Sequence, residues 1–305
     1  MTKRRKILPT TELRNRASEN IDRLSTQQIV DLINAQDALV PAAVARQRKQ
    51  IAAAIDVIVA RFKKGGRLFY VGAGTSGRLG VLDASECPPT FGVPPALVQG
   101  IIAGGRRALV RSAEGAEDYP EDGASAIEKK HVRARDVVVG LAACGMTPFV
   151  LGALEQARKI GAATIFITCA PEAVEHIPAE IIINPVVGPE VVTGSTRMKA
   201  GTATKLVLNT LTTGAMIRLG KVYGNLMVDL KATNEKLRDR SVRIVMEMTN
   251  LSRPRAQKLL DRAEGKVKAA IVMHFRRTDL AGALKILNEC DQFLRRAIVD
   301  AGETA

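Results

Sequence analysis

Two acidic segments carry the residues best suited to acid–base chemistry. Glu86 lies two residues before the pair Pro88 and Pro89. Because proline has no backbone N–H, we expect this pair to stop the preceding helix and leave Glu86 at its end. A carboxylate placed there can serve as a general acid or base, although a solvated helix-end glutamate is the alternative. Glu117 belongs to the second cluster, Glu114–Asp118, which is either functional or a solvated turn.

A glycine-rich loop precedes Glu86 and suits an anion. Residues 72–77 match Gly-x-Gly-x-x-Gly and include Thr75 and Ser76. A dinucleotide site would need an acidic residue about twenty positions later, where the chain reads Phe91–Pro95. The Gly-Lys-Ser/Thr of a P-loop is missing. Two hydroxyls beside backbone amides favour a phosphate monoester, and a structural turn or a dinucleotide stay as alternatives.

A second segment with hydroxyls, glycines and cations is Thr193–Thr202, which contains Arg197 and Lys199 and precedes a long apolar stretch. This composition predicts another anion or sugar-hydroxyl site. The alternative is an elaborate helix cap, because hydroxyl side chains also satisfy the free N–H groups at a helix start.

Short apolar runs alternate with helical patterns and would position these segments. The runs cover residues 67–71, 97–102, 137–142, 164–168 and 181–183. Alternation of this kind predicts an α/β fold, a parallel sheet flanked by helices in three Rossmann-like layers. Ligands bind such sheets at the carboxyl ends of the strands. The loops after Val71 and after Ala143 are therefore the expected site.

Helices are expected on both sides of this α/β region. Residues 10–62 predict helices, with a Ser25–Gln28 capping box and a second helix from about Pro41. Pro148 is placed to begin a helix, and a long one should cover Lys199–Leu219. No clear strand is expected over 223–305, which should be helical with a linker at Asn250–Pro254. We expect an N-terminal helical segment (1–56), a sheet domain (57–222) and a C-terminal helical region (223–305).

The amino-acid composition indicates which kinds of partner the protein should bind. The net charge of +14 could attract nucleic acid, but aromatic residues make up only 3% and Trp is absent, so a nucleic-acid partner is not expected. The sequence has no apolar run of membrane-spanning length and no apolar stretch after its basic first residues, which predicts a cytoplasmic protein without a membrane contact. Four widely spaced cysteines should be free thiols. Three scattered histidines lack metal-ligand spacing, so no metal is expected.

Taken together, these segments resemble the N-acetylmuramic acid 6-phosphate etherases. The long block around Glu86 is specific, whereas the last sixty residues match loosely. The resemblance is carried by Thr10–Asn15, Val71–Gly92, Ile101–Gly105, Glu114–Asp118, Thr193–Thr202, Asn225–Asp229 and Ala232–Leu237.

The resemblance implies a sugar-isomerase domain, a homodimer, and no metal or cofactor. It also implies cleavage of the lactyl ether of N-acetylmuramic acid 6-phosphate to N-acetylglucosamine 6-phosphate and D-lactate, a step of amino-sugar degradation and peptidoglycan recycling. The two family glutamates fall on Glu86, the candidate acid, and Glu117, the candidate base. The expected residues for substrate and phosphate binding are Gly74, Thr75, Ser76, Gly77, Arg78, Cys144, Gly145, Thr147, Glu190, Ser195, Thr196 and Lys199.

One loop departs from the family pattern. The family usually has Ala-Ser-Gly-Arg-Thr-Pro where this chain has Ala143–Pro148, with Cys144 and Met146 in place of Ser and Arg. The expected substrate loop thus lacks a hydroxyl and a charge. A non-catalytic sugar-phosphate regulator on the same fold, related to the glucokinase regulatory protein, is therefore the alternative. A sugar-phosphate isomerase would share the fold but not the block around Glu86.

Overall fold

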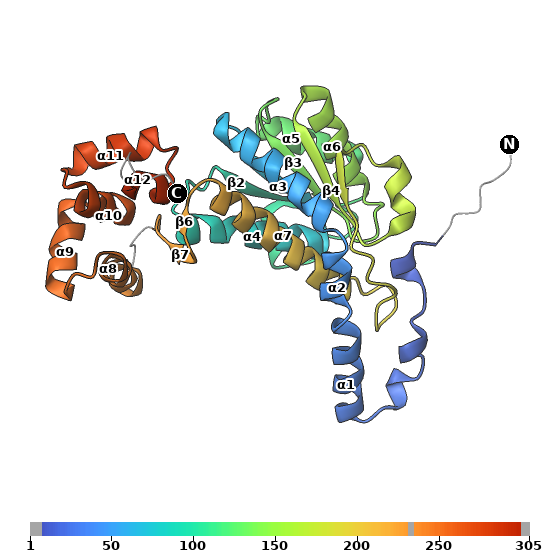
Figure 1. The fold of residues 1–305 in the computed structure, drawn as a ribbon. Coiled ribbons are helices and arrows are strands. Elements are labelled where there is room, and N and C mark those ends of the chain that lie inside the picture. Colours follow the sequence, from blue (N-terminus) through green and yellow to red (C-terminus); the bar gives the residue numbers. More distant parts are fainter. Residues whose placement is uncertain (1–7, 231–234, 300–305) are drawn as a thin grey trace. The chain divides into compact units, whose positions relative to one another are not determined.

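The computed structural model describes residues 8–230 and 235–299 (Figure 1). Within these residues the chain forms two compact units. The first comprises residues 8–85 and 96–212, and the second comprises 86–95 and the described residues from 213 onward. The basic residues at the N-terminus and residues 232–234 of the segment Ala232–Leu237 lie outside the described residues.

A five-stranded sheet forms the centre of the first unit. Its strands are β1 (Leu68–Gly72), β2 (Val98–Ile102), β3 (Val137–Leu141), β4 (Ala163–Ile167) and β5 (Ile181–Ile183). They lie in the order β2-β1-β3-β4-β5, and every neighbouring pair is parallel. Every residue of β1, β3 and β4 is buried, as expected for a sheet covered on both faces. The predicted fold class and its five strands are confirmed.

Helices cover both faces of this sheet (Figure 1). On one face, Phe69, Val138 and Phe166 join a core with α5 (Pro120–Lys129) and α6 (Pro148–Ile160). On the other face, Tyr70 and Leu141 approach Gly80 of α4 (Gly74–Phe91) so closely that a Cβ there would lie 2.8 Å from the Tyr70 Cβ. The unit also contains α3 (Arg48–Lys63), the first part of α7 (Lys199–Arg218) and the short 3-10 helices Gly105–Leu109 and Pro171–His176.

The expected end of α4 at Pro88 and Pro89 is wrong. Both prolines lie inside the helix, which continues to Phe91. Their rings remove two N–H donors, but the last turn is still closed by the Gly92 N–H, which donates to the Pro88 carbonyl at 3.0 Å. Gly92 has a φ of 66°, the left-handed conformation that commonly terminates a helix. Glu86 is therefore an interior residue of α4.

The N-terminal stretch forms three 3-10 turns (Thr10–Glu12, Arg16–Ser18 and Ile21–Arg23), followed by α1 (Thr26–Asp37) and α2 (Val40–Ala45). The predicted capping box is confirmed: the Ser25 hydroxyl accepts the Gln28 N–H, and the Gln28 side chain accepts the Ser25 N–H. The single helix expected from Pro41 is two helices, α2 and α3. They are separated at Gln47, whose side-chain oxygen accepts the Asn184 N–H at 3.0 Å.

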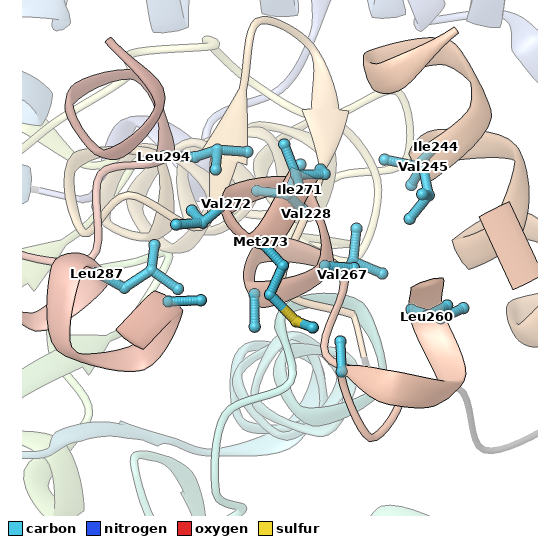
Figure 2. Close-up of a cluster of buried hydrophobic side chains, with 14 of the residues drawn as sticks. Val228, Ile244, Val245, Leu260, Val267, Ile271, Val272, Met273, Leu287 and Leu294 are labelled. Atoms are coloured by element: carbon cyan, nitrogen blue, oxygen red, sulfur yellow. The ribbon is translucent and has the colours of Figure 1, made fainter. Parts of the chain in front are cut away.

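The second unit is mainly helical. It contains α8 (Glu235–Thr249), α9 (Arg253–Arg262), α10 (Val267–Arg276), α11 (Leu280–Glu289) and α12 (Leu294–Ile298). Figure 2 shows Val267, Ile271 and Met273 of α10 at the centre of its apolar core. The linker predicted at Asn250–Pro254 is shorter than expected: Asn250 interrupts the helices with a φ of 55°, but Arg253 and Pro254 already belong to α9. The expectation of no strand is wrong, because β6 (Val222–Tyr223) and β7 (Leu226–Met227) form a short antiparallel hairpin.

No helix among the described residues is long and apolar enough to cross a membrane.

Candidate active site

The carboxyl ends of three strands bring the glycine loop and the acidic cluster to one edge of the sheet. Gly72 at the end of β1 pairs with Ile102 of β2 on one side and with Leu141 of β3 on the other. The loops that follow these strands therefore leave the sheet side by side. The strand order reverses around β1, and ligands of open α/β sheets bind at such a reversal.

The first of these loops turns at once into α4. Gly72 and Gly77 permit a close approach, since a Cβ on Gly77 would lie 2.8 Å from the Gly72 carbonyl oxygen. Thr75 and Ser76 lie in the first turn of α4 and are half-buried, and neither hydroxyl bonds to another described residue. The N–H groups of a first helical turn have no intrahelical partner and favour an anion. This geometry fits a phosphate group at the α4 N-terminus.

A small pocket of about 100 Å³ opens beside this turn, lined by residues of the loops after β1 and β2. Its polar lining includes Gly74, Arg78 and Glu117. The Arg78 Nε donates to the Leu109 carbonyl at 3.2 Å, which holds the guanidinium at the pocket wall. The Glu117 carbonyl accepts the Phe149 N–H at 3.0 Å, while its exposed side chain is free to meet a ligand.

The pocket also contains two residues that were not singled out individually from the sequence. The Ser112 hydroxyl donates to the Glu114 carboxylate at 2.5 Å, and both residues line the pocket with Glu117. The signal for them was present, because Glu114 belongs to the acidic cluster Glu114–Asp118. Spacing alone could not show which acid of that cluster faces inward.

The loop after β3 carries the departure from the family pattern. Gly145 has a φ of 78° and sits so close to Ala173 that a Cβ would lie 2.1 Å from the Ala173 Cβ. Cys144 is half-buried, and Met146 is 54% exposed. Thr147 is buried directly before α6 but its side chain does not cap that helix. The close contact at Gly145 thus fixes the backbone of the loop, while the Met146 side chain is exposed.

Glu190 and Lys199, two expected binding residues, have their polar atoms engaged inside the protein. The fully buried Glu190 accepts the Lys199 N–H at 3.0 Å and the Ala200 N–H at 2.9 Å, which caps the start of α7. The buried Lys199 ammonium donates to Gln36 Oε1 at 2.9 Å. Burial raises the pKa of Glu190, against the effect of its amide hydrogen bonds. Burial likewise lowers the pKa of Lys199, against the attraction of Glu190 and Asp37.

Ser195 and Thr196 stand between this buried pair and the α4 turn. Both are half-buried, and neither hydroxyl bonds to another described residue. A Cβ on Gly201 would lie 3.7 Å from the Thr75 Cγ2 and 3.4 Å from the Thr196 carbonyl oxygen. The start of α7 is therefore packed beside Thr75, at the first turn of α4.

Sequence reasoning did not find the contribution of the N-terminal residues. The Asn15 Nδ2 donates to Gln36 Oε1 at 2.8 Å and to the Pro189 carbonyl at 3.1 Å, and the Ser18 hydroxyl donates to the Val191 carbonyl at 2.7 Å. The bonds to Pro189 and Val191 join the N-terminal stretch to the loop before α7. They span 174 and 173 positions of the sequence, so no local pattern could have identified them.

Glu86 is exposed on α4 and belongs to the second unit, and it is not among the residues that line the small pocket. Three residues earlier, the buried Asp83 accepts the Tyr70 hydroxyl at 3.0 Å. This bond fixes α4 against β1 just before Glu86. Within the described residues no three His, Cys, Asp or Glu side chains gather in a way that could hold a metal ion.

Known proteins share this sequence and architecture. The family model of the glucokinase regulatory protein N-terminal SIS domain matches residues 50–158. Solved structures of low identity align with part of the chain. A putative phosphosugar isomerase involved in capsule formation from Bacteroides fragilis is 17% identical, with a TM-score of 0.46 over 64% of this chain and 91% of that chain. The phosphoheptose isomerase GmhA from Neisseria gonorrhoeae is 14% identical, with a TM-score of 0.45 over 62% and 97%.

The first unit thus belongs to the class of sugar-isomerase (SIS) domains. Curated relatives define the family more narrowly. The N-acetylmuramic acid 6-phosphate etherase of Rhodopirellula baltica is 55% identical over 96% of this chain and 97% of that protein. That of Nostoc punctiforme is 54% identical over 95% and 94%, and etherase 2 of Vibrio cholerae serotype O1 is 53% identical over 96% and 95%. The chain belongs to the N-acetylmuramic acid 6-phosphate etherase family.

Proposed function

We propose that this protein is a carbon–oxygen lyase that cleaves the D-lactyl ether of N-acetylmuramic acid 6-phosphate. The products are N-acetylglucosamine 6-phosphate and D-lactate, and the reaction belongs to amino-sugar recycling. The observation that carries the proposal is 55% identity with a curated etherase over nearly the whole of both chains. The pocket that joins Glu117 to the start of α4 supports it.

The reaction needs both an acid and a base because an unactivated ether is a poor leaving group. Opening of the sugar ring exposes an aldehyde, which acidifies the proton on the adjacent carbon. A base takes that proton and an acid protonates the departing lactate oxygen, which leaves a carbon–carbon double bond. Water then adds across this bond: its hydroxyl takes the position of the lactate and a proton returns to the adjacent carbon. General acid–base catalysis of each transfer contributes about 10²–10⁴-fold.

We assign the base to Glu117 and the acid to Glu86. Glu117 lines the pocket next to Arg78, which supports a place beside the bound sugar phosphate. Glu86 lies about three turns further along α4 than the phosphate-binding turn, in the block that most closely resembles the family. After lactate has left, the Glu86 carboxylate is suited to take a proton from the incoming water.

Phosphate recognition is assigned to the α4 turn. Thr75, Ser76 and the first-turn amides supply neutral donors, and the positive end of the helix favours a dianion. Gly74 and Gly77 allow the ligand and the strand to approach the backbone, and Arg78 adds positive charge. The remaining expected contacts come from the loop after β3 and the segment before α7, namely Cys144, Gly145, Thr147, Ser195 and Thr196.

Glu190 and Lys199 fit a positioning role in this proposal. Their polar atoms hold the start of α7 and the N-terminal helix α1, so they would act on the substrate through Ser195 and Thr196. We retain the proposed division into residues 1–56, 57–222 and 223–305, in which the middle part carries the sugar-isomerase domain.

The assembly and location belong to the same proposal. We infer a homodimer from the family resemblance. Light scattering should report about twice the 32.7 kDa chain mass. A cytoplasmic location is supported by the four free cysteines, because disulfides are rare in reducing compartments.

A lactate-release assay with N-acetylmuramic acid 6-phosphate tests the function. Glu86→Gln and Glu117→Gln should each lower kcat by about a hundredfold or more, because Gln keeps the shape but cannot transfer the proton. Glu155→Gln, an exposed carboxylate on α6, is the matched control and should retain parental turnover. Near-parental activity of Glu86→Gln or Glu117→Gln would overturn the role of that residue.

One observation favours a second candidate, a sugar-phosphate-binding regulator without activity. The loop after β3 has Cys144 and Met146 where the family usually has Ser and Arg, and the matched family model is that of a regulatory protein. Binding of N-acetylmuramic acid 6-phosphate without any release of lactate would establish this alternative.

A further inference from the structure

The second unit contains a cavity of about 600 Å³ that the etherase reaction does not use. Its lining comes from the start and one face of α9, the end of α10 and the turn into α11. Arg255, Lys258, Leu259 and Arg262 lie at spacings of three and four residues, so they share one face of α9. The opposite face of that helix is buried through Ala256 and Leu260.

The cavity is strongly positive. Arg255, Lys258, Arg262 and Arg277 line it, and none of them forms an ion pair with a carboxylate among the described residues. Arg253, at the start of the same helix, differs because it pairs with Asp239. Like charges three and four residues apart on a helix repel each other. An anion in the cavity would remove that repulsion.

Asp279 is the one acid among the described residues of the lining, and its carboxylate is already engaged. Its Oδ1 accepts the Gly282 N–H at 2.8 Å and caps the start of α11. The neighbouring acid on α9, Asp261, accepts the Gln257 amide at 2.7 Å. Both carboxylates keep their charge, but the lining has four cations and only one acid among the described residues, so it remains positive.

The floor of the cavity is apolar. Met273, which is 5% exposed, belongs to the core shown in Figure 2 and also lines the cavity. Leu251 and Leu259 line the cavity as well. His274 adds a ring to the same lining. A ligand with a charged group at one end and a ring or apolar face at the other would match both parts of the lining.

We propose that this cavity binds a phosphorylated small molecule, with the phosphate held by the α9 cations and Arg277 and the rest of the ligand over Met273. The volume lies in the range of small-molecule sites, about 300–1,000 Å³. Arginine binds phosphate through two parallel hydrogen bonds, which suits a dianion. A single-stranded nucleic acid would need stacking rings along an open groove, and the lining has no Phe, Tyr or Trp among the described residues.

Methyl NMR of protein labelled with ¹³C-methyl methionine tests the site and separates it from the sugar-phosphate site. The Met273 methyl reports on the cavity, and the Met146 methyl reports on the loop after β3. The Met273 signal is assigned with Met273→Leu, a change that conserves volume. The probes are AMP and glucose 6-phosphate, each paired with its uncharged match, adenosine or glucose, and inorganic phosphate.

We expect AMP or glucose 6-phosphate to shift the Met273 signal in a saturable way, and the uncharged matches to leave it unchanged. The triple variant Arg255→Gln, Lys258→Gln and Arg262→Gln should weaken this response at least tenfold, because each lost charged contact is worth about 1.5–3 kcal/mol. The control triple Arg240→Gln, Arg243→Gln and Lys285→Gln removes the same charge outside the cavity. It should retain parental binding within about twofold, since exposed charges contribute little at a distance under salt screening.

The proposal is overturned by any of three results. The first is a Met273 signal that none of the phosphorylated probes shifts at about 10 mM, the weak end of small-molecule affinity. The second is equal weakening in both triple variants, which would mean general surface charge. The third is competition between AMP and a fluorescent single-stranded oligonucleotide that binds much more tightly than AMP does. This result would make the cavity part of a nucleic-acid surface. The two proposals can fail separately. If the phosphorylated probes shift the Met273 signal but the protein releases no lactate, the cavity proposal holds and the proposed etherase activity is wrong.

Discussion

The starts of α4 and α7 have similar sequences and different surroundings. Both combine glycine, hydroxyl residues and a cation directly before or within the first helical turn. At α4, the Thr75 and Ser76 hydroxyls make no bond to the described residues and lie beside an open pocket. At α7, the first-turn amides of Lys199 and Ala200 are already bonded to Glu190.

The difference between the two helix starts indicates where a ligand can bind. A helix start attracts an anion because its N–H groups lack partners. Glu190 accepts these N–H groups from within the chain at the start of α7, whereas the start of α4 has no such acceptor among the described residues. The same composition therefore belongs to a structural cap in one place and to our proposed phosphate site in the other.

Removal of the internal anion should give the largest effect on stability. Glu190→Ala leaves the buried N–H groups of Lys199 and Ala200 without their acceptor. A buried donor left without a partner costs about 1–3 kcal/mol. Urea unfolding of the variant should show a free energy of unfolding lower by that amount. The exposed Glu155→Ala is the control and should stay within about 0.5 kcal/mol of the parent. A loss below about 1 kcal/mol for Glu190→Ala would mean that the cap is dispensable.

Removal of the two hydroxyls at the start of α4 should weaken substrate binding and leave the free energy of unfolding nearly unchanged. In Thr75→Ala with Ser76→Ala, two half-buried hydroxyls that bond to no described residue are removed, so the free energy of unfolding should change by less than about 1 kcal/mol. The Michaelis constant for the sugar phosphate should rise about tenfold or more, since hydrogen bonds to a charged group contribute about 1.5–3 kcal/mol each. Urea unfolding and lactate-release kinetics on the same preparation measure both. An unchanged Michaelis constant would contradict the assignment of the α4 turn.

Local patterns in the sequence were sufficient for the sheet, the glycine loop and the Ser25–Gln28 capping box. Each depends on residues that are close in sequence, such as the apolar run that forms β3 and the glycines around Thr75. The acidic cluster could be placed near the site because the carboxyl ends of parallel strands share one edge. Its orientation could not, since the inward turn of Glu117 depends on the bond between its carbonyl and Phe149.

Other features required information that no local pattern contains. The two prolines of α4 predicted a helix end, but the turn closed by Gly92 extends the helix past them. The hairpin of β6 and β7 was missed although Gly224-Asn225 is a typical turn pair, because its strands have only two residues each. The residue that caps α7 could not be found within Thr193–Thr202, because the cap is Glu190, whose bonds reach nine and ten residues along the chain.

The smallest expected effect concerns the loop after β3, the third part of the open edge. Cys144 and Met146 stand where relatives have Ser and Arg, and a thiol is a weak donor while a thioether donates nothing. The Gly145 contact with Ala173 fixes the backbone of this loop, so new side chains at 144 and 146 should not rearrange it. Cys144→Ser with Met146→Arg should therefore lower the Michaelis constant by up to about tenfold and change kcat less, because one charged hydrogen bond is worth about 1.5–3 kcal/mol.

Parent and variant are compared in the same buffer at two ionic strengths, and Cys144→Ser alone separates the effect of the hydroxyl from that of the charge. If the arginine acts on the phosphate, the gain should shrink at higher salt. An unchanged or higher Michaelis constant would show that the side chains at 144 and 146 do not limit substrate binding.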